Sequence, residues 1–102
     1  MARYVTIVRG TPELASAWVE KWKAVATGTA PKAVLDAMKK VKVITVEVSI
    51  ANNLAFWVTE VKDEDFLETT KFVRYFTDVV RMEMYPVISL EDYNKLIMSE
   101  WK

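Results

Sequence analysis

The feature that most restricts the fold is a hairpin pattern near the middle of the chain. Over residues 41–50, apolar side chains recur at every second position, which is the period of a strand with one buried face. Residues 51–53, Ala-Asn-Asn, predict a turn, because asparagine tolerates the left-handed backbone conformation. A returning strand is expected over residues 54–61. An antiparallel pair of strands therefore lies at the centre of the predicted fold.

The length of this turn decides which side chains share a face of the sheet. A three-residue turn would pair Val48 with Phe56. The next pair on that face would be Val46 with Val58, so that two apolar rows meet. A two-residue turn would instead pair Val48 with Trp57. We favour the three-residue turn, because a slip by one residue would expose the whole apolar set.

Strand and helix patterns alternate on both sides of this hairpin. Residues 4–8 are typical of a strand, and residues 11–13, Thr-Pro-Glu, are typical of a helix start with a hydroxyl cap and a proline in the first turn. Apolar residues at helical spacing continue to Gly28, and Pro31 begins a shorter second helix. The first connection is therefore predicted to be helical and broken in two.

The second half of the chain repeats this alternation. The acidic residues 63–65 favour a helix N-terminus, and a strand is predicted over residues 79–85. Pro86 lacks a backbone N–H, so we expect strand pairing to end there. Ser89 then begins a capped C-terminal helix. This order predicts a single α+β domain over residues 1–102, with a ferredoxin-like βαββαβ arrangement, a four-stranded antiparallel sheet and an added C-terminal helix.

In this arrangement helices cover one face of the sheet and leave the other open. If Val5 and Ile7 point toward the helices, alternation determines the rest of both faces. Three aromatic side chains on an open sheet face are not expected to be left to water. The candidate residues for a ligand site or an interface on the open face are Tyr4, Glu47, Trp57, Arg81, Glu83 and Tyr85.

Four uses of this face are consistent with the sequence. Its charges can simply discourage aggregation of an edge strand. Two copies can lay their open faces together, with the aromatic side chains inside the interface. A pocket between paired sheets can bind a small molecule, and a carboxylate buried there would have a raised pKa and could act as a base. RNA can stack on strand aromatics, although the characteristic RNP1 pattern is missing.

Composition removes several other classes of function. The chain has no cysteine and no histidine, so we predict no metal site and no cofactor. Its formal net charge is zero, which argues against nucleic acid as a partner and leaves room for self-association. Without a long apolar run, a cytoplasmic location away from membranes is expected. The absence of glutamine is typical of thermophiles.

The stretch "VRMEMYPVISLEDYNKL" resembles the C-terminal end of an uncharacterised family of small bacterial and archaeal proteins. In that family an acidic and apolar strand runs into Pro-Val-Ile-Ser/Thr, here residues 86–89, and then into a capped helix. The stretch "NNLAFWVTEVKDEDFL" is similar to the central hairpin return of the family. The resemblance implies a ferredoxin-like fold of the dimeric α+β barrel type, and it lends no catalytic residue.

From these patterns we predict a protein that self-associates through the open face of its sheet, as a homodimer or a larger homo-oligomer. The alternative is a small-molecule binding protein, or an enzyme without a cofactor, that uses a pocket between paired sheets. The two hypotheses differ in whether the candidate residues meet in a dry interface or line a cavity.

Overall fold

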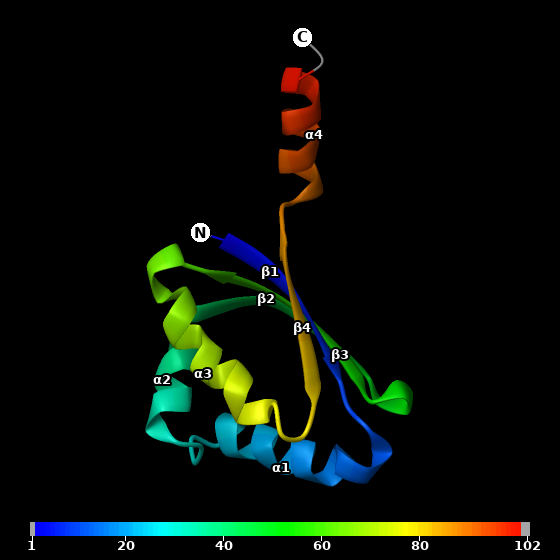
Figure 1. Ribbon diagram of the computed structural model, residues 1–102, viewed down its shortest axis with the longest axis vertical. Helices are drawn as coiled ribbons and strands as arrows, with labels where there is room; N and C mark the ends of the chain where they lie inside the picture. The colour runs from blue at the N-terminus through cyan, green and yellow to red at the C-terminus, as the bar shows by residue number, and fades with distance from the viewer. Residues whose placement is uncertain (1, 101–102) are drawn as a thin grey trace.

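A computed structural model describes residues 2–100 and shows the predicted α+β fold (Figure 1). Three short 3₁₀ turns, Pro12–Leu14, Ile50–Asn52 and Asp63–Asp65, precede α1, β3 and α3. The longer elements are β1 (Ala2–Arg9), α1 (Ala15–Ala26), α2 (Lys32–Lys39), β2 (Val41–Ser49), β3 (Leu54–Val61), α3 (Phe66–Phe76), β4 (Arg81–Val87) and α4 (Leu90–Glu100).

The four strands form one antiparallel sheet in the order β2-β3-β1-β4. This is the ferredoxin-like order, and β4 lies at an edge beside β1, as predicted. The helices α1, α2 and α3 lie on one side of the sheet, whereas α4 projects away from it (Figure 1). No helix within residues 2–100 is long and apolar enough to cross a membrane.

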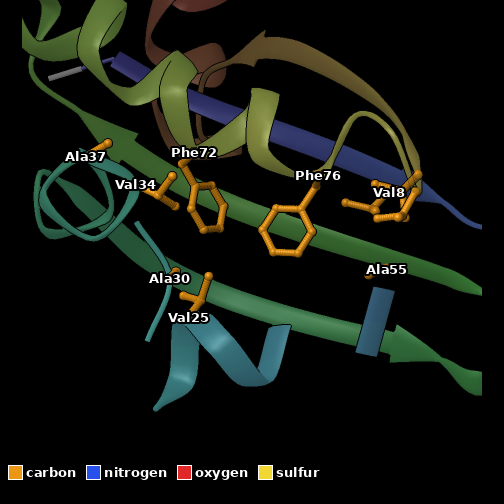
Figure 2. Packing of buried hydrophobic residues seen from close by; sticks show 10 residues of the cluster. Val8, Val25, Ala30, Val34, Ala37, Ala55, Phe72 and Phe76 are labelled. Carbon is orange, nitrogen blue, oxygen red and sulfur yellow. The ribbon is translucent and has the colours of Figure 1, made fainter. Parts of the chain in front are cut away.

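The core lies between the sheet and the three covering helices (Figure 2). Phe76 of α3 is 1% exposed, and Ala37 of α2 is fully buried. Figure 2 shows the rings of Phe72 and Phe76 projecting from α3 toward the strands. The small residues Val8 and Ala55 meet them from β1 and β3. Small strand residues leave room for large helix residues, so that the two layers interdigitate.

The hairpin between β2 and β3 differs from the predicted one. Its turn holds four residues, because Ser49 pairs with Leu54 across a 3₁₀ turn that ends at Asn53. Asn53 has φ of 50°, which confirms the left-handed position predicted for an asparagine in this turn. Val48 therefore pairs with Ala55. The extra residue turns over every side chain of β3 relative to the predicted register.

Strand β2 also contains a β-bulge, which reverses the alternation of its side chains between the two faces of the sheet. The register moves between Val43 and Thr45, so Val43 and Val46 both lie on the helix-covered face despite their odd spacing. Strict alternation in the sequence gave no sign of this bulge. Strict alternation would place Val43 on the opposite face from Val46 and Val48, but all three face the helices.

The prediction that Tyr4 and Trp57 lie on the open face is wrong. The ring of Trp57 meets Trp22 of α1 edge to face at 5.2 Å between centroids. The ring of Tyr4 packs against that of Phe66 in α3, with 5.1 Å between their centroids. Phe56 points outward instead and is 40% exposed. Both faces of β1 carry apolar side chains, so alternation alone could not decide which face the helices cover. The rings of Tyr4 and Trp57 instead pack against aromatic side chains of those helices.

The edge strand β4 follows the predicted alternation but not the predicted end. Met82 and Met84 face the helices, and Arg81, Glu83 and Tyr85 lie on the open face. Pairing continues through Pro86, which lies opposite Tyr4, to Val87. Proline is accepted there because an edge strand needs hydrogen-bond donors on one side only.

The C-terminal helix α4 begins at the predicted cap. The hydroxyl of Ser89 accepts a hydrogen bond from the backbone N–H of Asp92 at 3.1 Å. Beyond this cap most apolar residues of α4 face solvent, since Leu90 is 72% exposed and Met98 is 65% exposed. The helix therefore has an apolar surface that no other part of residues 2–100 covers.

Candidate functional site: an apolar groove walled by tryptophans

A groove of about 550 Å³ lies between α1 and the β2–β3 hairpin, open to solvent on one side. We call it the tryptophan groove, because three indole side chains contribute to its walls. Its lining residues are Ala15, Trp18, Val19, Trp22, Lys23, Val46, Val48, Ser49, Ile50, Asn53, Leu54, Ala55 and Trp57.

One wall of the groove is formed by residues of α1 that lie four positions apart in the sequence. Trp18 and Trp22 lie one turn apart, so their rings project from the same side of the helix. Trp22 remains 37% exposed, which leaves part of its indole facing the groove. Gly10 packs against Trp18, since a Cβ atom at Gly10 would lie 2.9 Å from Cε3 of that indole. Because Gly10 has no side chain, the indole of Trp18 can pack directly against the backbone that precedes α1.

The hairpin supplies the opposite wall and is unusually apolar for an exposed surface. Val48 is 61% exposed and Ile50 is 86% exposed. The backbone N–H of Gly10 donates a hydrogen bond to the carbonyl oxygen of Asn53 at 2.7 Å. This bond fixes the turn beside the chain that leads into α1. Aliphatic side chains on one side and indoles on the other form a slot suited to an apolar or planar molecule.

Few polar groups reach the groove. The Nζ atom of Lys23 lies 3.5 Å from a carboxylate oxygen of Glu20. The side-chain amide of Asn52 donates to the hydroxyl of Ser49 at 2.9 Å. The lining contains no carboxylate. Within residues 2–100, no group of three acidic, cysteine or histidine residues is placed to hold a metal ion. The groove is therefore built for apolar contact and stacking.

The six candidate residues divide between the two faces. Glu47, Arg81, Glu83 and Tyr85 lie on the open face, as predicted. Tyr4 and Trp57 lie under the helices, and of the six only Trp57 lines the tryptophan groove. Sequence reasoning did not single out Trp18 and Trp22 as site residues among the other apolar residues of α1. Their shared helical face was the available signal that α1 presents an aromatic wall.

Glu83 is the centre of a polar network on the open face. The Tyr85 hydroxyl donates to its Oε2 at 2.7 Å, and Nε of Arg9 donates to its Oε1 at 3.2 Å. Nε of Arg81 lies 3.8 Å from the same Oε1. The hydrogen bond from Tyr85, helped by Arg9, lowers the pKa of Glu83, and the carboxylate in turn raises the pKa of Tyr85. In the single chain the pKa of Glu83 is therefore lowered, which is opposite to the raised pKa expected of a carboxylate buried as a base.

This network makes a pH-dependent contribution to stability. Because the pKa of Glu83 is lowered in the folded protein, the contribution is present above its ordinary value of 4.5 and is lost as pH falls below it. We expect Glu83→Gln to lower the melting temperature slightly at pH 7. The difference from the unmodified protein should shrink as pH falls from 4.5 toward 3. A difference that stays constant across that range, measured by thermal unfolding, would contradict the assignment.

An apolar patch occupies the middle of the same open face. We call it the open-face patch, and it consists of Val5, Ile7, Phe56 and Val58. Val5 pairs with Val58 and Ile7 with Phe56 across β1 and β3, so the four side chains form one continuous area. Ion pairs border the patch. One of them joins Arg3 and Glu60 at 3.3 Å. An apolar centre with a charged border is the usual composition of a protein interface.

These features define a ferredoxin-like α+β protein with an apolar cavity between a helix and the sheet. A solved structure titled "Crystal structure of antibiotic biosynthesis monooxygenase" has this fold, with a TM-score of 0.55 and 11% sequence identity. The match covers 88% of this chain and 99% of that chain. At this identity the similarity concerns the fold. No protein-family model matches the sequence, and no curated protein matches it either.

Proposed function

We propose that this protein binds a small, largely apolar molecule in the tryptophan groove. The observation that carries the proposal is an apolar cavity of about 550 Å³ with indole side chains of Trp18, Trp22 and Trp57 in its walls. Small-molecule sites usually occupy about 300–1,000 Å³ and are lined mainly by apolar and aromatic side chains. The proposed site lies within one chain, between α1 and the hairpin, whereas the alternative drawn from the sequence placed a pocket between paired sheets.

The lining indicates the class of ligand. Indole faces and aliphatic side chains favour an aromatic or aliphatic molecule with few polar groups. The similar fold of a protein titled as a monooxygenase of antibiotic biosynthesis supports a small organic ligand. The groove offers no histidine or carboxylate as a proton acceptor. The proposal is therefore binding, and it includes no reaction.

A thermal-shift screen with aromatic and aliphatic alcohols tests this function. A ligand present at about 100 times its dissociation constant stabilises the folded state by about 2.7 kcal/mol. For a chain of this size that corresponds to a rise in melting temperature of about 13 °C. We expect at least one planar aromatic alcohol, such as 2-naphthol, to produce a concentration-dependent rise. A broad panel without any rise would contradict the proposal.

A second function, self-association with another copy of the chain, is supported by an independent observation. The chain exposes 7117 Å², whereas a folded monomer of this mass exposes about 5,900 Å². Its radius of gyration is 15.7 Å, against about 13 Å for a compact domain of this length. The excess surface is comparable to the roughly 800 Å² that each partner buries in a typical stable complex.

The open-face patch and α4 are the parts of the chain that such a partner would cover. Phe56 is the most exposed residue of the patch, and Tyr93 of α4 is 50% exposed. We propose that two copies pair through the open-face patch and that α4 packs against the second copy. The zero net charge of the chain favours this association, because identical copies then repel each other little.

A further inference from the structure

A second, smaller cavity lies behind the tryptophan groove. It has a volume of about 40 Å³ and lies between the sheet and the helices α2 and α3. We call it the inner cavity. Three buried threonines, Thr6, Thr59 and Thr69, line it together with Met82 and Met84. It has room for a few water molecules at most, which is much less space than the tryptophan groove offers.

Trp57 separates the inner cavity from the tryptophan groove. Of the described residues, it alone lines both spaces. Its backbone pairs with Thr6 on β1, an inner-cavity residue, and with Val46 on β2, a groove residue. The indole therefore forms a partition between the tryptophan groove, which is large enough for a ligand, and the inner cavity, which is not.

The partition is held in position from both sides. On the groove side, Trp22 packs edge to face against Trp57, with 5.2 Å between the two ring centroids. The ring of Phe72 in α3 lies on the core side, with 5.7 Å between its centroid and that of the Trp57 ring. Such aromatic pairs restrain ring orientation beyond what burial alone provides. A ring held in this way closes the inner end of the groove in the folded protein.

We propose that Trp57 limits the length of the ligand that the tryptophan groove accepts. This inference rests on the proposed binding function and adds a residue that determines specificity. A smaller side chain at position 57 would join the groove to the inner cavity and add the volume that the indole now fills. A longer ligand would then reach the cavity wall formed by Thr6 and Thr59. Those hydroxyl groups suit an alcohol or carbonyl group at the inner end of the ligand, since a buried hydroxyl gains from a hydrogen-bond partner.

The experiment compares n-alkanols of six to fourteen carbons by isothermal titration calorimetry. With the unmodified protein, affinity should rise about fourfold for each added methylene group until the groove is filled, and then level off. In Trp57→Val the affinity should continue to rise over several further carbons. Valine suits the strand, and Trp57→Phe, which keeps a ring opposite Trp22, should give an intermediate limit.

Phe76→Leu is the matched control, because Phe76 is a buried aromatic residue that lines neither space. It should bind the same lengths as the unmodified protein. If Trp57→Val and Trp57→Phe both keep the unmodified length limit, the inference is overturned while the proposed binding stands. If the unmodified protein binds no alkanol, the proposed function fails for this ligand class, and the inference fails with it.

Discussion

If two copies pair through the open-face patch as proposed, substitution of Phe56 by glutamate is expected to shift the protein to the monomer. Phe56 is the most exposed side chain of the open-face patch, so pairing of two copies through this patch around a two-fold axis would bury it in each copy. An unpaired carboxylate buried in an interface costs several kcal/mol. A loss of about 3 kcal/mol per dimer corresponds to an increase of more than a hundredfold in the dissociation constant. Sedimentation equilibrium across a range of concentrations measures this change.

Leu67→Glu is the matched control for this substitution. Leu67 is 80% exposed on α3, outside the open-face patch, so the same chemical change there should leave the assembly intact. Both variants should keep the circular dichroism of the folded protein, because both positions are exposed. An unchanged mass for Phe56→Glu, at concentrations where the unmodified protein associates, would contradict pairing through this face.

The second large effect is expected at Trp22. Trp22→Ala removes one indole wall of the tryptophan groove and the edge-to-face contact that holds Trp57. Truncation of a tryptophan at the centre of a binding site commonly costs 2 kcal/mol or more. We therefore expect affinity for 2-naphthol to fall about thirtyfold or more in calorimetric titrations.

Tyr93→Ala provides the control, since Tyr93 is an exposed aromatic residue of α4 that does not line the groove. It should bind 2-naphthol with unchanged affinity. Equal losses for Trp22→Ala and Tyr93→Ala would place the ligand outside the groove, or would show that binding to aromatic surface is unspecific. The melting temperature of Trp22→Ala should be measured alongside, because the same ring also packs near Phe76.

The order of strands and helices was predictable because each element has its own local signal. The two-residue period of β2, the proline that precedes α2 and the serine cap of α4 each depend on neighbours within a few residues. The ferredoxin-like topology then follows, because few arrangements connect these elements with short right-handed crossovers. The fold needed no information about long-range packing.

The faces of the sheet depended on such packing and could not be predicted in the same way. In β1 both Val5 and Thr6 are acceptable core residues by type, and the bulge at Ile44 leaves no local signal. Arg81 and Glu83 were placed correctly on the open face, because charged side chains at alternate positions of β4 are disfavoured under the helices. The tryptophan groove was missed for the same reason. It exists only once α1 and the hairpin meet, so no single segment of the sequence reveals it.

The central claim is that a small apolar molecule binds between α1 and the hairpin. A titration of ¹⁵N-labelled protein with 2-naphthol, followed through the indole N–H resonances, tests it most directly. We expect the signals of Trp18, Trp22 and Trp57 to shift together and saturate at a stoichiometry of one ligand per chain. If these three signals stay in place at saturating ligand, or if only backbone signals of the open-face patch move, the claim is contradicted.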